Sequence, residues 1–527
     1  MSAQPLDDQR LHLVLLVGNP IEHDTRVRKT ALSAVALGLR VTVVAYTHDL
    51  VGSTTTFGPV DVVNVPVEFT MRDRSADRRR LRRFLLFPFG YGSPLAIRAA
   101  ARRRRLADLD LMVDSGRGVQ LGHYDHASVG GTMARLRRNV RKQTNRVHRK
   151  FTVVRIRIGR LYTGRRLPLD RARAQRWFSH RPMGNWRRLL PEYLDYEVSF
   201  APVIDELAPD LLHANDVVMI GVASNAVDRA RLRGRTIPWL YDAHEYVPGM
   251  GRYLPDRIAG MADHEKEYIG RADAVLTVSD PIADSIQQRT GLTERPIVVL
   301  NTPYGVRAPD RERPSVRAAV GLAEGVPLLV YSGNMAPDRG VTTLVEALEF
   351  LDPAVHVALV TNVPLENRYM QTLVRSAEGS GCRDRLHFAP YVPGGQIADY
   401  LSTGDVGVQG LNHVPNHEMA LPNKLFDYLH AGLPMIVSDV KAMADFVTGL
   451  GIGEVYVADD PVGLAKAAMQ VLSDPERYAN ALAADPELLQ TYSWERQEER
   501  LREVYARLLG CSPTDFRRPS AAPGQEI

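Results

Sequence analysis

The sequence predicts an α/β protein made of two units, each with a parallel β-sheet and crossover helices. Three observations point to this class. The chain has 527 residues, several times the roughly 150 residues of an average domain. Its composition, 45% hydrophobic and 24% charged, is that of a folded soluble chain and excludes collagen-like or wholly disordered proteins. Toward both ends of the chain, short β-branched runs alternate with helical patterns, which is typical of parallel sheets.

The first unit is predicted from seven strands. They span residues 11–18, 39–46, 60–67, 210–214, 238–243, 274–279 and 297–300. The helix after the first strand should begin at Asp24, whose side chain can cap it, and should stop at Gly38. Its buried face is predicted from apolar residues at helical spacing, namely Val27, Ala31, Ala34 and Val35.

A second series of six strands follows the proline-containing stretch 302–314. These strands span residues 328–332, 355–361, 386–390, 406–410, 435–439 and 455–458. The first helix of this series has an apolar stripe of Val341, Leu344, Val345, Leu348 and Leu351. A last helix is predicted from Ser493, with an apolar side of Trp494, Leu501, Val504, Tyr505 and Leu508. Residues 511–527 are predicted to form a disordered tail.

A strongly basic block interrupts the first unit. Residues 71–190 contain 32 Lys and Arg against 7 Asp, a local net charge of +25, whereas the rest of the chain carries −20. With the aromatic residues of 84–89 beside its arginines, the block could lie on an anionic membrane, where each basic residue contributes about 1 kcal/mol. The alternatives are a solvated insertion and a nucleic-acid surface. No nucleic acid is expected, because no recognised binding motif accompanies the charge.

The sequence predicts a cytoplasmic protein. No apolar run approaches the roughly 18 residues of a membrane-spanning helix, and the N-terminus lacks the basic start and cleavage site of a signal peptide. The two cysteines, Cys382 and Cys511, offer neither a disulfide framework nor metal-ligand spacing. No metal site is expected.

Ligands of open parallel sheets bind beyond the carboxyl ends of the strands, so polar loops at those positions are candidate site residues. The first such loop contains Gly18, Asn19, Asp24 and Arg26. Its glycine allows a close backbone approach, and Arg26 could hold an anion at the helix start. The alternative is a tight turn capped by Asp24.

The second loop follows residues 238–243 and contains His244, flanked by Asp242 and Glu245. A histidine at such a rim could orient a sugar hydroxyl or a leaving phosphate, or could be structural. The third loop runs from Gly333 and Asn334 to Arg339. Arg339 could meet a phosphate, or could be a solvated residue of a capped turn.

The fourth loop, residues 416–434, is the most specific. Pro422 favours a helix start, and Lys424 and Asp427 lie three residues apart on one helical face. This pair suits a nucleotide diphosphate with its ribose, with Lys424 on phosphate and Asp427 accepting from ribose hydroxyls. A surface ion pair is the alternative.

Together these motifs resemble family 4 glycosyltransferases of the GT-B fold. The resemblance is carried by residues 18–20 and 24–27, 242–245, 333 with 339–340, and 421–428 with 431–434, and it covers residues 11–70 and 190–510. It implies two facing Rossmann-like domains with parallel sheets. It further implies a nucleotide-sugar donor, UDP- or GDP-linked, bound mainly by the second domain, an acceptor bound mainly by the first, and a retaining, hexosyltransferase-type transfer without a metal or other cofactor.

The resemblance also implies roles for single residues. Arg339 falls where the family has a lysine near the donor diphosphate, and Lys424 is a second phosphate contact. Asp427 falls at the second acid of the family's E-x7-E pattern, which binds ribose. His244 falls at the active-site histidine near the transferred sugar, and the Gly18 loop lies where the family approaches diphosphate and acceptor. His244, Arg339 and Lys424 are therefore the expected catalytic residues.

The chain departs from the family pattern at two of these positions. The first acid of E-x7-E should lie where this chain has Met419, and the adjacent Glu418 is predicted to replace it among the donor-binding residues if the loop is shifted by one. The family's arginine after the glycine of the third loop is Asn334 here.

The implied organisation has five parts. These are an acceptor domain of residues 1–70 and 190–305, the Arg-rich insertion 71–189, a donor domain 306–490, a helix 491–510 crossing back to the first domain, and the tail 511–527. The predicted function is sugar transfer to a glycan or lipid-linked acceptor in cell-envelope glycolipid or polysaccharide synthesis, at the inner face of the membrane as a peripheral protein. A non-catalytic binding protein of the same fold and a nucleotide-sugar epimerase-like enzyme are the alternatives.

Overall fold

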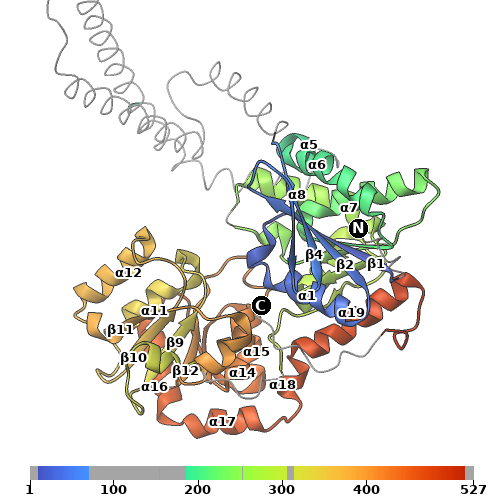
Figure 1. Cartoon of the computed structure of the whole chain (residues 1–527). Coiled ribbons are helices and arrows are strands. Elements are labelled where there is room, and N and C mark those ends of the chain that lie inside the picture. The colour runs from blue at the N-terminus through green and yellow to red at the C-terminus, as the bar shows by residue number, and fades with distance from the viewer. Residues whose placement is uncertain (1–9, 70–153, 155–185, 252, 306–313, 517–527) are drawn as a thin grey trace, which may run out of the picture. The chain divides into compact units, whose positions relative to one another are not determined.

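The computed structural model describes residues 10–69, 154, 186–251, 253–305 and 314–516 (Figure 1). The chain divides into two units, one of residues 1–68 and 183–527 and the other of residues 69–182. Apart from residues 69 and 154, all described residues belong to the first unit. The predicted basic insertion 71–189 therefore lies outside the described residues, except for residues 154 and 186–189.

The first sheet has eight strands in the order β3-β4-β2-β1-β5-β6-β7-β8. Their bounds are β1 His12–Val17, β2 Arg40–Thr47, β3 Ser53–Phe57, β4 Val60–Pro66, β5 Leu211–Asn215, β6 Trp239–Ala243, β7 Ala274–Thr277 and β8 Ile297–Val298. All neighbours are parallel except β3, which is antiparallel to β4. Because β1 pairs with both β2 and β5, the chain order reverses there, and the loops after β1 and β5 open side by side.

The seven predicted strands of this sheet are confirmed, and β3 was missed. Four of the five β3 residues are exposed, so the strand has no buried face and lacks the alternating pattern that would have revealed it. The predicted first helix is confirmed as α1, Thr25–Ala36, and the Asp24 side chain accepts a hydrogen bond from the Val27 N–H. The other helices of this half are α5 Trp186–Leu189, α6 Glu192–Leu207, α7 Asp216–Leu232, α8 Pro255–Tyr268 and α9 Asp280–Thr290.

The second sheet has six parallel strands in the order β11-β10-β9-β12-β13-β14. Their bounds are β9 Leu328–Ser332, β10 His356–Val360, β11 Leu386–Ala389, β12 Val406–Gln409, β13 Met435–Ser438 and β14 Gly453–Tyr456. The longer helices that flank it are α11 Val341–Ala347, α12 Arg368–Gly379, α14 Asn423–Ala431, α15 Lys441–Leu450, α16 Pro461–Ser473 and α17 Pro475–Ala483. All six predicted strands are confirmed, and the predicted apolar stripe of the first helix is buried in the core.

The last long helix, α19 (Trp494–Leu509), packs on the first sheet. Its predicted apolar residues Trp494, Leu501, Val504 and Tyr505 are buried in the same core cluster as β1 and α1. Phe516 is 8% exposed and belongs to this cluster too. The prediction of a disordered tail from residue 511 is therefore wrong for residues 511–516, because the aromatic ring at their end finds an apolar site. Residues 517–527 lie outside the described part of the chain.

Lys29 of α1 contacts two other segments, residues 301–302 and the start of α19. Its Nζ donates to the Asn301 Oδ1 at 2.7 Å and to the Thr302 carbonyl at 2.6 Å, and lies 4.4 Å from the centre of the Trp494 ring. The backbone N–H of Trp494 donates to the Pro303 carbonyl at 2.7 Å. Burial lowers the pKa of Lys29 to about 7, and the positive charge of Arg26 acts in the same direction. We call Lys29, Asn301, Thr302 and Trp494 the Lys29 cluster.

Among the helices that the structure describes, none combines the length and apolar character needed to cross a lipid bilayer.

Candidate functional site

The predicted phosphate and ribose residues lie at the start of α14, which connects β12 to β13. Leu425, Tyr428 and Leu429 of this helix are buried. The side chains of Lys424 and Asp427 are largely enclosed too, at 21% and 11% exposure. The Lys424 Nζ lies 3.3 Å from the Asp427 Oδ2 and 3.1 Å from the Tyr391 hydroxyl. Burial by itself lowers the pKa of the Lys424 ammonium, but the neighbouring Asp427 carboxylate and Tyr391 outweigh it and raise the pKa above its ordinary value.

Gly333 adjoins Lys424 at the end of β9. Its φ of +146° is one that residues with a side chain rarely adopt, and a Cβ at this position would lie 3.5 Å from the Lys424 Cε. The glycine is therefore required by the backbone conformation, whereas a Cβ would meet the lysine stem only at an ordinary contact distance. We call Gly333, Lys424, Asp427 and Tyr391 the Lys424 cluster. Asn334, the next residue, is exposed.

Arg339 ends a short 3-10 turn, Pro337–Arg339, just before α11. The following Gly340 has φ +67°, and a Cβ there would lie 1.7 Å from the Gly410 carbonyl oxygen. Burial raises the pKa of the nearby Tyr331, and the positive charges of Arg339 and Lys424 both act against this rise. Both cations therefore lie within electrostatic reach of one tyrosine at the end of β9.

Glu418 makes two contacts within its own half of the protein. One oxygen accepts from the His413 Nδ1 at 2.5 Å, and the other accepts from the Lys441 N–H, at the start of α15, at 2.9 Å. The His413 Nε2 lies 3.0 Å from the Asp439 Oδ1. The hydrogen bond to Glu418 is the main cause that raises the pKa of His413. Glu418 thus holds the loop against α15, and its contact with a transferred sugar stays a prediction.

In the first sheet, His244 lies between two carboxylates. Its Nε2 is 3.2 Å from the Asp242 Oδ2, and its Nδ1 is 3.3 Å from the Asp216 Oδ1. Burial lowers the pKa of the imidazole, but the carboxylates of Asp216 and Asp242 outweigh burial and raise the pKa to about 9. His244 is therefore an imidazolium at neutral pH.

The prediction that Arg26 holds an anion is wrong. The Arg26 side chain is 4% exposed, and its Nε and Nη2 each donate to Asp242 at 2.9 Å, while its Nη1 donates to the Val299 carbonyl at 2.8 Å. Burial would raise the pKa of Asp242, but Arg26, foremost among the neighbouring groups, holds it well below its usual range. The Arg26 guanidinium is bound by the buried Asp242 carboxylate at the end of β6. It is therefore not available to a ligand at the start of α1.

Asp216, His213 and the hydroxyl of Tyr505 belong to this network and were missed from the sequence. Asp216, directly after β5, has φ +63°, which is unusual for a residue with a side chain. Partial loss of hydration raises the pKa of its carboxyl, whose side chain is 36% exposed, to about 6. Tyr505 of α19 hydrogen-bonds the His213 Nδ1 at 2.9 Å, and the His213 Nε2 lies 3.7 Å from Asp242. A polar residue directly after a buried strand was the available signal for Asp216.

The remaining residues of the first loop form a compact turn. A Cβ on Gly18 would lie 2.3 Å from the Val218 Cγ1, so only glycine fits there. The Asn19 amide donates to the Asp24 Oδ2 at 3.1 Å, while the Asp24 Oδ1 accepts from the Val27 N–H. Asn19 and Asp24 are thus paired with each other and hold the start of α1.

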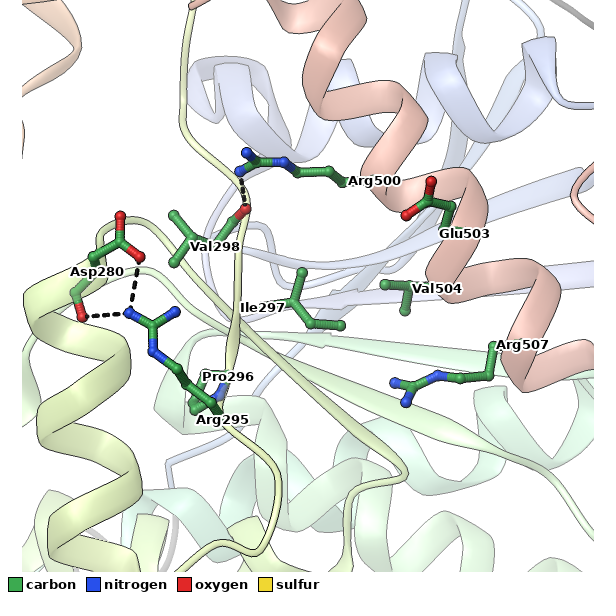
Figure 2. A pocket seen from close by; sticks show the side chains of 9 residues that line it. All are labelled: Asp280, Arg295, Pro296, Ile297, Val298, Arg500, Glu503, Val504 and Arg507. Atoms are coloured by element: carbon green, nitrogen blue, oxygen red, sulfur yellow. Dashed lines mark hydrogen bonds and ion pairs between the residues drawn. The ribbon is translucent and has the colours of Figure 1, made fainter. Parts of the chain in front are cut away.

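A separate pocket of about 610 Å³ lies between β8 and α19 (Figure 2). None of the predicted site residues lines it. Its arginines are engaged within the protein: Arg295 with Asp280 at 2.8 Å, Arg500 with the Val298 carbonyl at 2.5 Å, and Arg507 with Glu294 at 3.1 Å. We therefore do not assign this pocket to the candidate site.

Within the described part of the chain, no group of three or more His, Cys, Asp or Glu side chains is arranged to hold a metal ion.

Two family models match the chain. The model described as "Glycosyltransferase Family 4" matches residues 160–304, and the model described as "Glycosyl transferases group 1" matches residues 326–474. Together these segments make up more than half of the chain.

Two curated proteins illustrate the sequence similarity. A D-inositol 3-phosphate glycosyltransferase of Xylanimonas cellulosilytica is 24% identical over 194 residues, which are 37% of this chain and 45% of that protein. A putative teichuronic acid biosynthesis glycosyltransferase, TuaC, of Bacillus subtilis is 23% identical over 240 residues, 45% of this chain and 55% of that protein. The chain thus matches about half the length of these two relatives.

Solved structures with the same fold cover nearly the whole chain. Sucrose-phosphate synthase from Thermosynechococcus elongatus aligns with a TM-score of 0.59 and 15% identity over 95% of this chain and 100% of that one. A structure titled trehalose-6-phosphate from E. coli, bound with UDP-2-fluoro glucose, aligns with a TM-score of 0.55 and 11% identity over 95% of this chain and 99% of that one. At these identities the likeness shows the fold.

Proposed function

Because the chain belongs to the family 4 glycosyltransferases and has their GT-B fold, we propose that it transfers a hexose from a nucleotide-sugar donor to an acceptor hydroxyl with retention of configuration. The observation that carries this proposal is the Lys424 cluster. A charged ammonium lies beside a carboxylate and against a glycine at the carboxyl ends of a parallel sheet. This is where open α/β sheets bind nucleotides, and the two side chains match a diphosphate and a ribose.

In this proposal the second domain binds the donor. Lys424 and Arg339 contact the diphosphate, and Asp427 accepts hydrogen bonds from the ribose hydroxyls. A UDP-linked donor is supported by the structural neighbour bound with UDP-2-fluoro glucose, and GDP remains the alternative nucleotide. Gly333 lets the phosphates approach the backbone, and Asn334 and Glu418 lie in the two loops that border this position.

The proposed reaction is a front-face substitution. The bond between the anomeric carbon and the phosphate oxygen breaks, and the acceptor oxygen bonds to the same face of that carbon. The acceptor hydroxyl passes its proton to the departing phosphate oxygen. Lys424 and Arg339 stabilise the negative charge that develops there, and removing one such group typically lowers the rate by about 100-fold. His244, whose two ring nitrogens face Asp216 and Asp242, is assigned a place beside the transferred sugar. No metal or other cofactor is assigned a role.

We further propose a glycan or lipid-linked acceptor and a role in cell-envelope glycolipid or polysaccharide synthesis. The similarity to a putative teichuronic acid biosynthesis glycosyltransferase supports this role. The charge of +25 in residues 71–190 supports peripheral binding to the anionic inner face of the membrane, where basic residues are attracted. The acceptor would then be reached in the plane of the membrane.

A thermal-shift screen against UDP, GDP, ADP and their common sugar conjugates tests the donor assignment. A ligand that binds only the folded protein stabilises it by about 2.7 kcal/mol at 100 times its Kd. One nucleotide series should shift the melting temperature, and Asp427→Asn should reduce that shift. No shift at millimolar ligand would contradict the proposal and favour a non-catalytic protein. Release of free nucleotide only when a membrane extract supplies an acceptor would exclude an epimerase-like activity.

A further inference from the structure

Tyr391 contacts Lys424 although the two residues come from distant parts of the second sheet. Tyr391 follows β11 at one edge of the sheet, whereas Lys424 begins α14, between β12 and β13. The lysine side chain passes Gly333 at the end of β9 and reaches the Tyr391 hydroxyl, to which its Nζ donates at 3.1 Å. The Lys424 side chain thus extends along the carboxyl edge of the sheet, and its ammonium is held there by the Tyr391 hydroxyl.

The hydrogen-bonding capacity of the ammonium is only partly used. A lysine ammonium has three N–H donors. Two of them are directed to the Tyr391 hydroxyl and to the Asp427 Oδ2, at 3.1 Å and 3.3 Å. Among the described residues no third acceptor bonds the ammonium, and the side chain remains 21% exposed. One donor is therefore available to an anion from solvent, and its direction is set by the other two.

We propose that Tyr391 is a positioning residue of the nucleotide site: its hydroxyl, together with Asp427, orients the Lys424 ammonium so that the third N–H meets a diphosphate oxygen beside Gly333. This inference rests on the proposed function. A long lysine side chain loses rotamer freedom when it binds a ligand, and holding it beforehand removes part of that loss. The tyrosine thereby strengthens phosphate binding without touching the phosphate.

A further observation agrees with this role. Asp427 and Tyr391 raise the pKa of Lys424 against the effect of burial. The ammonium therefore keeps its charge and all three donors at neutral pH. Tyr391 itself is 41% exposed, so a change at its hydroxyl should leave the fold intact.

The test compares nucleotide affinities of the wild type and Tyr391→Phe, which loses the hydroxyl and keeps the ring. UDP and GDP are titrated by calorimetry, and uridine and guanosine are measured by competition. We expect the affinity for the bound diphosphate to fall about five- to tenfold, the size of the effect of one typical hydrogen bond, and the nucleoside affinity to stay unchanged. In a Lys424→Met background, Tyr391→Phe should have no further effect.

Tyr369→Phe is the matched control, because it removes a hydroxyl that bonds Thr342 at 2.9 Å in the same domain; it should bind every ligand as the wild type does. Unchanged diphosphate affinity in Tyr391→Phe would overturn the inference. So would an equal loss for nucleosides, or an undiminished loss in the Lys424→Met background, because Tyr391 would then act independently of the lysine. A wild type that binds no nucleotide would overturn the proposed function, and the inference with it.

Discussion

Replacing Lys29 by methionine should change how the stability of the protein depends on pH. The amine is 7% exposed, donates two short hydrogen bonds, and is held next to the Trp494 ring. Burial lowers its pKa from 10.5 to about 7, and Arg26 acts in the same direction, while the carboxylates of Asp427 and Glu495 partly offset both. Methionine keeps a similar volume and removes the titrating group.

The sign and size of the effect follow from proton binding. Above pH 7 the folded protein releases the Lys29 proton, whereas the unfolded chain keeps it until about pH 10.5. The unfolded state then binds one proton more, so the free energy of unfolding rises with pH, by up to about 1.4 kcal/mol per unit. Between pH 7.5 and 9.5 the wild type should gain about 2 kcal/mol relative to Lys29→Met. This contribution is lost progressively as the pH falls from about 10.5 to about 7, and below pH 7 it no longer changes because both states then bind the proton.

Urea denaturation at half-unit pH steps measures this difference, with the m-value checked for constancy. Lys466→Met, at an exposed position on α16, is the matched control, and its difference from the wild type should not change over this range. A wild-type minus Lys29→Met difference that stays flat from pH 7.5 to 9.5 would refute the reasoning, because Lys29 would then keep its proton in the folded state.

Three other outcomes are expected. Asp427→Asn should weaken binding of the nucleoside diphosphate about tenfold or more in calorimetry, because hydrogen bonds from ribose to a charged acceptor are lost; an unchanged affinity would remove the ribose assignment. Gly340→Ala should destabilise the protein by several kcal/mol in urea denaturation, because a Cβ would overlap a backbone carbonyl at 1.7 Å, whereas Gly379→Ala, which has open space, should have a small effect. In NMR titration the pKa of His244 should lie near 9, and Asp216→Asn should lower it; a pKa that is insensitive to this substitution would show that the carboxylate does not stabilise the imidazolium.

Much of the fold could be predicted because its signals are local. The parallel strands are buried, so they appear as short apolar runs whatever their partners are. The Asp24 cap and the Lys424–Asp427 pair each lie within one helical turn, and the spacing of the side chains along a helix determines their proximity. The missed strand, Ser53–Phe57, is explained by the same reason. It is an exposed edge strand without a buried face, so its sequence shows no apolar pattern.

The sequence by itself determined two α/β units, their described strands except β3, both ends of α1, the starts of α14 and α19, and the position of the polar loops. Only the tertiary structure decided which polar groups share those loops. Arg26 pairs with Asp242, 216 positions away, instead of facing a ligand, and Tyr391 reaches Lys424 across the sheet. Such pairs depend on strand order and on the depth at which each charge is buried. The local periodicity of the sequence indicates neither the strand order nor the depth of burial, because it shows only which side of a helix or strand faces the core.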